Sequence, residues 1–142
     1  MLSKVIYTAS AISTGGRTGR SRTSDGMLDV KLDKPTSMGG KGAGINPEQL
    51  FACGYAACFG GTLDFLSKQR GLSANTIDVA AEVDFGPRAA GGYGIGVRLK
   101  ISLPELSRDD ALSLIAEAHR NCPYSNATRG NIDVDVSLVA HG

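Results

Sequence analysis

The segment from Asn46 to Gly71 constrains the fold more than any other part of the sequence. Asn46 is a good N-cap residue, Pro47 suits the first helical position, and Gln49 completes a pattern similar to a capping box. Gly71 suits the position just after a helix end, which predicts a helix running to about Arg70. Apolar side chains cover most of its circumference, as is typical of a buried helix: Leu50, Phe51, Cys53, Ala57, Cys58, Phe59, Leu63, Phe65 and Leu66. Its small residues permit close approach of a neighbouring backbone: Gly54, Ala56, Ala57, Gly60 and Gly61.

The rest of the chain reads as strands with one further helix. Period-two alternation and β-prone composition predict strands at residues 4–9, 20–23, 28–32, 77–85, 93–103 and 132–138. Asp25-Gly26 predicts a hairpin between the second and third strands, and Gly91-Gly92 a turn between the fourth and fifth. Ser107, with Asp110 three residues later, begins a helix that ends near Cys122-Pro123, and a polar turn follows. Hairpins with helices between them predict an α+β fold, built as a single domain of residues 1–142.

Composition excludes several classes of function. The 142 residues are 42% apolar and 20% charged, which is enough for a sizeable core and argues against disorder. Fifteen basic and fourteen acidic residues give a net charge of +1, so we expect neither a nucleic-acid partner nor an anionic membrane surface. We expect no signal peptide, because the first residues contain no long apolar run, and we expect no stretch to approach a membrane span. We therefore expect a cytoplasmic protein.

Cys58 is the first candidate for chemistry. Three cysteines are an odd count, which argues against a purely structural disulfide framework. A free cysteine inside an apolar helix is commonly a small core residue, and this interpretation stays open. A cysteine that acts as a nucleophile must be a thiolate, but Cys58 lies too deep in its helix for the N-terminal dipole to help. An apolar setting would raise its pKa, so a cation has to come from elsewhere.

Arg17 is the better candidate for that cation. It follows Gly15-Gly16, where a turn can aim its guanidinium inward, although most loop arginines are simply exposed. An arginine that enters an apolar region needs an anion, and Glu48 in the first helical turn could supply it; alternatively, Glu48 only complements the helix dipole. His119 lies on or beside the apolar stripe of the second helix, and we expect it to be a packed or half-exposed residue.

Helix geometry suggests how these groups meet. Glu48 and Cys58 are separated by roughly 15 Å along one regular helix, which is too far for one arginine headgroup to bridge. Antiparallel packing of two copies would bring Glu48 of one chain toward the middle of the other. We therefore expect a symmetric homodimer with a shared site.

Cys122 is the natural second thiol, because a sulfenic acid condenses with a nearby thiol to form a disulfide. A core position at a helix end explains it equally well. Cys53 lies about 140° around the helix from Cys58 and reads as a structural core cysteine. No cysteine and histidine spacing suggests a zinc site, and the glycine-rich segments at residues 39–44 and 91–96 lack the context of a phosphate loop, so no metal and no cofactor are expected.

Taken together, motifs from nearly the whole chain resemble the OsmC/Ohr family, in its organic hydroperoxide resistance branch. The resemblance rests on Gly15-Gly16-Arg17, Asp25-Gly26, residues 28–32, residues 46–51, Gly54-Tyr55, Ala57-Cys58-Phe59 and residues 122–134. It implies an intertwined homodimer in which antiparallel sheets wrap two central helices. It further implies a peroxidase that prefers organic and fatty-acid hydroperoxides and is recycled by a dithiol such as a protein-bound dihydrolipoyl group.

By the same resemblance, Cys58 is the peroxidatic cysteine and Cys122 the resolving cysteine. Arg17 and Glu48 are the charged pair that activates the thiolate and positions the peroxide. Two alternatives remain: a general OsmC-type peroxidase with broader preference, and a non-catalytic dimer that binds a small apolar ligand. A redox-sensing regulator is disfavoured because no basic DNA-reading element is evident.

Overall fold

The computed structural model describes residues 1–139 and divides into two compact units, residues 1–50 and residues 51 onward. Helix α1 (Pro47–Gln69) begins in the first unit and continues through the second. The α+β class expected from the sequence is confirmed, since each unit contains a three-stranded sheet and the second adds helices. That the chain acts as a single domain stays a prediction.

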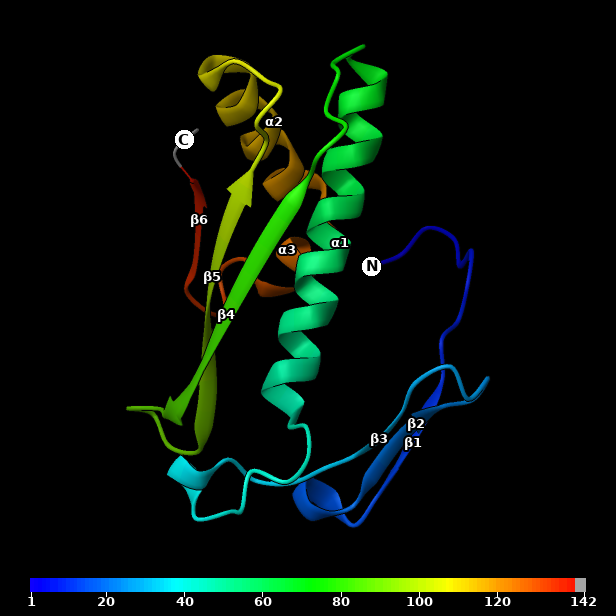
Figure 1. Cartoon of the computed structure of the whole chain (residues 1–142), viewed down its shortest axis with the longest axis vertical. Helices are drawn as coiled ribbons and strands as arrows, with labels where there is room; N and C mark the ends of the chain where they lie inside the picture. The colour runs from blue at the N-terminus through cyan, green and yellow to red at the C-terminus, as the bar shows by residue number, and fades with distance from the viewer. Residues whose placement is uncertain (140–142) are drawn as a thin grey trace. The chain divides into compact units, whose positions relative to one another are not determined.

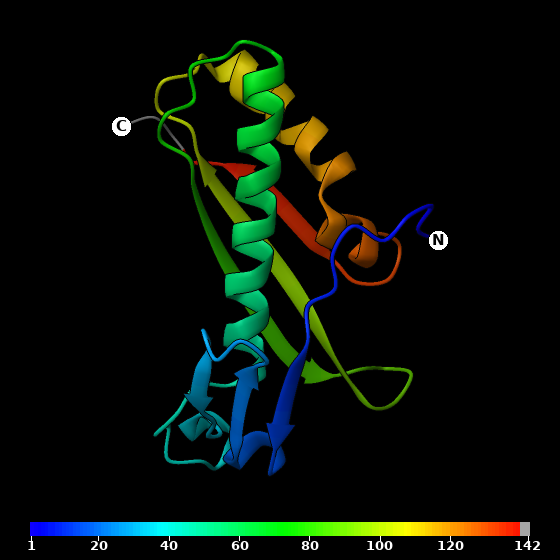
Figure 2. The same ribbon diagram turned by 90° about the vertical axis from the view of Figure 1, so that its right-hand side faces the viewer.

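The first unit is built on an antiparallel sheet in the order β1-β2-β3, drawn in blue in Figure 2. Its strands are β1 (Ala11–Thr14), β2 (Arg20–Thr23) and β3 (Asp29–Lys31), with short 3-10 helices η1 (Gly16–Thr18) and η2 (Thr36–Met38) between elements. The predicted hairpin is confirmed: Gly26 has φ 74°, and the Asp25 carboxylate accepts the Met27 N–H at 2.9 Å. The strand predicted at residues 4–9 is wrong. Ala11 pairs with Thr23, the last residue of β2, so earlier residues have no strand opposite them there.

The second unit contains the longer sheet, in the order β4-β5-β6. Strands β4 (Asp78–Pro87) and β5 (Tyr93–Ser102) form an antiparallel hairpin, and its turn places Gly91 and Gly92 at positive φ as predicted. Strand β6 (Val134–Leu138) pairs with β5 in parallel, which corrects the expectation of purely antiparallel sheets. The reason is the connection: α2 (Arg108–Asn121) and α3 (Pro123–Thr128) carry the chain back along the sheet before β6 begins (Figure 1).

The helix ends follow the capping chemistry of the sequence. Asn46 and Gln49 exchange reciprocal side-chain to backbone hydrogen bonds of 2.9 Å, and Ser107 accepts the Asp110 N–H at 3.1 Å. Gly71 has φ 66°, as a residue just past a helix end often does. The polar turn predicted after Cys122 is instead the short helix α3. Proline at its first position is compatible with a helical start, so the segment coils again at once.

The core of the second unit lies on one face of its sheet, covered by α1 and α2 (Figures 1 and 2). Alternate β5 side chains face these helices, and burial of each large apolar side chain contributes about 1.5–3 kcal/mol. The fully buried apolar side chains of this core include Tyr55, Phe59, Leu63, Leu99, Ile101, Leu103 and Leu114. The opposite face is polar, where Arg98 pairs with Asp84 and Lys100 with Glu82.

Only one side of α1 takes part in this core, which corrects the expectation of a helix buried nearly all round. Cys53, Ala57, Gly61 and Phe65 are exposed and recur every four residues, forming one stripe along the helix. With 23 residues and a window of mean hydropathy 1.3, α1 is long and apolar enough to cross a membrane. The expectation that no stretch approaches a span is therefore wrong by length and composition, although core helices also meet these criteria.

Candidate active site

The structure brings two of the predicted site residues into contact, both in the second unit. The Sγ atoms of Cys58 on α1 and Cys122 at the α2–α3 junction lie 3.7 Å apart. Both thiols are free, Cys122 fully buried and Cys58 partly accessible. Disulfide formation needs the sulfurs to approach to about 2.05 Å, so a small side-chain movement separates this arrangement from a bond. An accessible thiol backed by a buried one suits a reaction in which an outside oxidant meets Cys58 first.

The position of Cys122 is set by the junction between two helices. Its N–H donates to Ala118 at 2.7 Å as the last bond of α2, and its carbonyl accepts the Asn126 N–H at 2.9 Å as the first bond of α3. Its own backbone is extended, with φ −60° and ψ 127°. Pro123 then fixes the direction in which α3 leaves. Cys122 is thus held from both sides and has little freedom to move away from α1.

Opposing effects act on the Cys58 thiol. Burial raises the pKa of Cys58 above its ordinary value, and the neighbouring Cys122 thiol raises that pKa further. The backbone N–H of Tyr124, in the first turn of α3, hydrogen-bonds to Cys58 and lowers its pKa, but the net direction is upward. This amide was missed in the sequence, although a Cys-Pro helix start implies free N–H groups just after the proline.

An aromatic cluster lies beside the thiols on the N-terminal side of Cys58. The ring centroids of Phe51, Tyr55 and Tyr124 are 5.7–6.0 Å apart. Gly54 makes room for it, since a Cβ at that position would lie 3.1 Å from the Tyr124 hydroxyl oxygen. Phe51 and Tyr55 stand seven and three residues before Cys58 on α1, so the cluster lies within two helical turns of this thiol.

The other two predicted residues meet in the first unit. Arg17 donates to both carboxylate oxygens of Glu48, from Nη1 at 2.9 Å and from Nη2 at 2.7 Å. These bonds hold the pKa of Glu48 below its ordinary value and raise that of Arg17. The tight turn that carries Arg17 requires glycine, because Gly15 and Gly16 have positive φ and a Cβ at Gly19 would lie 1.7 Å from the Thr14 carbonyl. The guanidinium is thus presented by a constrained turn and oriented by a bidentate carboxylate.

The structure contradicts the sequence prediction for Cys53 and agrees with that for His119. Cys53 does face away from Cys58, but it is exposed on the α1 stripe, so its assignment as a core cysteine is wrong. The reason is that α1 packs on one side only. His119 is half-buried as expected, with its ring 6.4 Å from that of Phe59. Burial lowers the pKa of His119, and the nearby Arg129 lowers it further.

A chain of buried hydroxyl groups joins α1, α2 and α3, and sequence reasoning missed it. The Tyr55 hydroxyl lies 2.8 Å from Ser125 Oγ and 3.2 Å from Thr128 Oγ1. His119 Nδ1 lies 2.8 Å from the same Ser125 Oγ. The only signal for this hydroxyl chain in the sequence is that Ser125 and Thr128 are polar residues in a short segment after Cys122. A contact between residues 70 positions apart leaves no local pattern.

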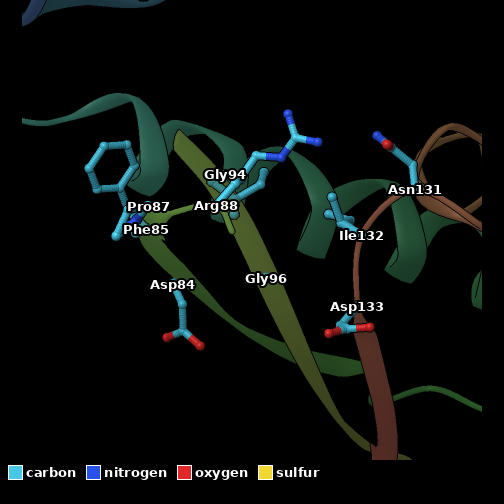
Figure 3. A pocket seen from close by; sticks show the side chains of 11 residues that line it. Asp84, Phe85, Pro87, Arg88, Gly94, Gly96, Asn131, Ile132 and Asp133 are labelled. Atoms are coloured by element: carbon cyan, nitrogen blue, oxygen red, sulfur yellow. The ribbon is translucent and has the colours of Figure 1, made fainter. Parts of the chain in front are cut away.

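A separate pocket of about 420 Å³ lies where the β4–β5 hairpin meets residues 131–133 (Figure 3). It is hollow because glycines stand at three wall positions, Gly86, Gly94 and Gly96, with Asp84 and Asp133 on either side of β5. Cys58 and Cys122 do not line it. Within residues 1–139, no group of three or more His, Cys, Asp or Glu side chains is arranged to hold a metal ion.

The fold and the paired thiols correspond to a known class of protein. The sequence profile of the family described as "OsmC-like protein" matches residues 40–137, and the chain belongs to this family. A crystal structure of an organic hydroperoxide resistance protein OsmC from Legionella pneumophila superimposes with a TM-score of 0.92 at 40% identity, covering 96% of this chain and 100% of that one.

Relatives of known name lie in the organic hydroperoxide resistance branch of the family. The chain is 48% identical over 138 residues to an organic hydroperoxide resistance protein of Xanthomonas axonopodis pv. citri, covering 96% of each. It is 40% identical over 134 residues to organic hydroperoxide resistance protein OhrB of Bacillus subtilis, covering 94% of this chain and 98% of the relative. The resemblance drawn from the sequence motifs is thereby confirmed.

The Arg17–Glu48 pair gives an acid-dependent contribution to stability. Because the pKa of Glu48 is lowered in the folded chain, the pair stabilises the fold above the ordinary carboxyl pKa. That contribution is lost as pH falls through the lowered value. We expect the free energy of unfolding, measured by urea titration at pH 7 and pH 3, to fall less in Glu48→Gln than in the wild type. Asp135→Asn, at an exposed position outside the ion pairs described for residues 1–139, serves as the control and should follow the wild type. An equal fall in Glu48→Gln would contradict the assignment.

Proposed function

We propose that this chain is a cysteine-based peroxidase that reduces organic hydroperoxides to alcohols. The observation that carries the proposal is the 3.7 Å approach of a partly accessible thiol, Cys58, to a buried one, Cys122. The relatives named organic hydroperoxide resistance proteins support a role in peroxide detoxification. The aromatic cluster beside Cys58 supports a substrate with an alkyl tail, since apolar walls favour apolar ligands.

The chemistry proceeds in two steps within the protein. The Cys58 thiolate attacks the distal oxygen of the hydroperoxide, an S–O bond forms, the O–O bond breaks, and the alkoxide leaves and takes up a proton as the alcohol. Cys58 is then a sulfenic acid. The Cys122 sulfur attacks the Cys58 sulfur, water leaves, and a disulfide remains. Two electrons have passed from the two thiols to the peroxide.

An external dithiol completes the cycle by thiol–disulfide exchange, in which one of its thiolates attacks the disulfide and its second thiol releases the mixed disulfide. Both protein thiols are regenerated and the dithiol leaves oxidised. The family resemblance favours a dihydrolipoyl protein as this reductant and the cytoplasm as the compartment. No bound metal or organic cofactor is needed to balance these steps.

The raised pKa of Cys58 gives a nearby cation a clear role in the proposed mechanism. Arg17, oriented by Glu48, is the proposed source, and a guanidinium near the sulfur would favour the thiolate. Glu48 and Cys58 lie ten residues apart on α1, roughly 15 Å along the axis. We therefore propose a homodimer in which Arg17 and Glu48 of one chain serve Cys58 of the other. The exposed stripe of small and apolar residues along α1 supports antiparallel packing of two copies.

The direct test is to count free thiols after adding one equivalent of an alkyl hydroperoxide to the reduced protein. We expect rapid loss of two thiols, no loss in Cys58→Ser, and a trappable sulfenic acid in Cys122→Ser. Cys53→Ser is the matched control and should still lose two. Unchanged thiols in the wild type would contradict the peroxidase and favour a ligand-binding dimer, whereas equal rates with hydrogen peroxide would favour the broader OsmC-type activity.

The role of Arg17 predicts a shift in pH dependence. If its charge stabilises the Cys58 thiolate, Arg17→Gln should move the midpoint for alkylation of Cys58 by iodoacetamide to higher pH, because a lost cation disfavours the charged form. The peroxide rate at pH 7 should fall at least about tenfold, since each unit of pKa shift removes about tenfold in thiolate fraction. Arg20→Gln, whose exposed guanidinium pairs with Asp29 instead, is the control. An unmoved midpoint would remove Arg17 from the mechanism.

The shared site predicts complementation between two defective chains. We expect Cys58→Ser to be inactive alone and Arg17→Gln to keep at most about a tenth of the wild-type rate, whereas a mixed dimer would contain one site with both residues intact. We expect mixing the two under exchange conditions to restore activity, up to about a quarter of the wild-type value if half the dimers are mixed. Absence of recovery despite proven exchange, or full activity in a monomer, would place the whole site within one chain.

A further inference from the structure

We infer that the hydroxyl groups of Tyr55, Ser125 and Thr128, with His119, are positioning residues that control closure of the disulfide between Cys58 and Cys122. This inference rests on the two-cysteine chemistry proposed above. Tyr55 and Ser125 are fully buried and Thr128 nearly so, with 6% of its surface exposed. No buried side-chain nitrogen or oxygen among the described residues lacks a hydrogen-bond partner, so the chain is complete.

The chain has one consistent direction. Thr128 Oγ1 donates to the Ser125 carbonyl at 3.2 Å, so its bond to Tyr55 must be donated by the tyrosine hydroxyl. The Ser125 hydroxyl then donates to the Tyr55 oxygen, and His119 Nδ1–H donates to Ser125 Oγ. Each hydroxyl thus gives one hydrogen and accepts one. Removal of the Tyr55 hydroxyl leaves a buried donor on Ser125 and a buried acceptor on Thr128 without their partner.

The hydroxyl chain and the thiol pair are adjacent cross-links between the same helices. Tyr55 precedes Cys58 by three residues on α1, so the two side chains lie on neighbouring turns of one face. Ser125 follows Cys122 by three residues, in the first turn of α3. The amide of Tyr124, between them, hydrogen-bonds to Cys58. The Tyr55–Ser125 bond therefore fixes the helix start that carries both the resolving thiol and this amide.

The position of the hydroxyl chain affects which of two reactions the Cys58 sulfenic acid undergoes. Attack by the Cys122 sulfur forms the disulfide and releases water. Attack on a second hydroperoxide adds another oxygen to Cys58, gives a sulfinic acid and releases a second alcohol. The first path needs the sulfurs to close from 3.7 Å, and any loosening of α3 against α1 slows it. The second path needs no such approach. The hydroxyl chain therefore sets the partition between turnover and overoxidation.

The test is Tyr55→Phe in the full chain, which keeps the ring and deletes the hydroxyl. After one equivalent of alkyl hydroperoxide, loss of the Cys122 thiol from the preformed sulfenic acid should be roughly tenfold slower, in line with the loss of one buried hydrogen-bond network. With excess peroxide, intact mass should show a larger sulfinic fraction per disulfide formed. Tyr93→Phe is the control, because Tyr93 is exposed and stacks on Phe85 away from the thiols. It should keep the wild-type partition.

A second pair of variants separates positioning from general destabilisation. Thr128→Val keeps the shape of the side chain and loses its hydroxyl, whereas Thr128→Ser keeps the hydroxyl and loses a methyl group. Slow closure in Thr128→Val with a normal rate in Thr128→Ser supports the inference, even if Tyr55→Phe does not fold. Wild-type closure in a folded Tyr55→Phe, or equal closure in the two Thr128 variants, overturns it. Wild-type thiols that never react with peroxide would overturn the proposed function as well.

Discussion

The packing of one face of α1 against β5 and α2 is the constraint on which the candidate site depends. Tyr55, Phe59 and Leu63 are fully buried there and fix the rotation of the helix about its axis. That rotation turns Cys58 toward the α2–α3 junction and leaves the stripe from Cys53 to Phe65 outside the core. The same packing therefore places the two thiols side by side and leaves the α1 stripe exposed, the surface to which the proposed homodimer assigns a second copy.

The same packing creates the chemical difficulty for which the proposed mechanism needs the charged residues. An apolar environment suits an organic substrate, but it raises the pKa of Cys58 and so disfavours the nucleophilic thiolate. One backbone amide, from Tyr124, opposes this effect without reversing it. A guanidinium can supply the missing stabilisation, but a flexible arginine would lose entropy on each approach. The bidentate pair with Glu48 and the glycine turn around Arg17 remove much of that freedom beforehand.

The sequence correctly predicts caps and turns, which depend on neighbouring residues. It does not predict features that depend on contacts between segments far apart in the sequence. Local sequence predicted the helix caps at Asn46 and Ser107 and the turns at Gly26 and Gly91, because each depends on residues within a few positions. The parallel pairing of β6, the true start of β1 and the one-sided burial of α1 depend on which segments meet in space. Among site residues, Cys58 and Cys122 carry recognisable contexts. The Tyr55–Ser125 bond joins residues 70 positions apart, and no pattern in one sequence encodes it.

In the proposed mechanism, the burial of Cys122 has a purpose of its own. Cys122 is buried and Cys58 is partly accessible, so in that mechanism an outside peroxide would meet Cys58 first and burial would fix the order of oxidation. A buried thiol can act only on a sulfur already placed beside it, which makes its reaction depend on helix register more than on its own reactivity. The sulfurs have to close from 3.7 Å, and apolar contacts alone have no direction that would hold α3 in place against α1. The hydrogen bonds that join Tyr55 to Ser125 and to Thr128 are directional, so a polar chain inside an otherwise apolar core is the feature expected where a proposed disulfide has to close between two helices.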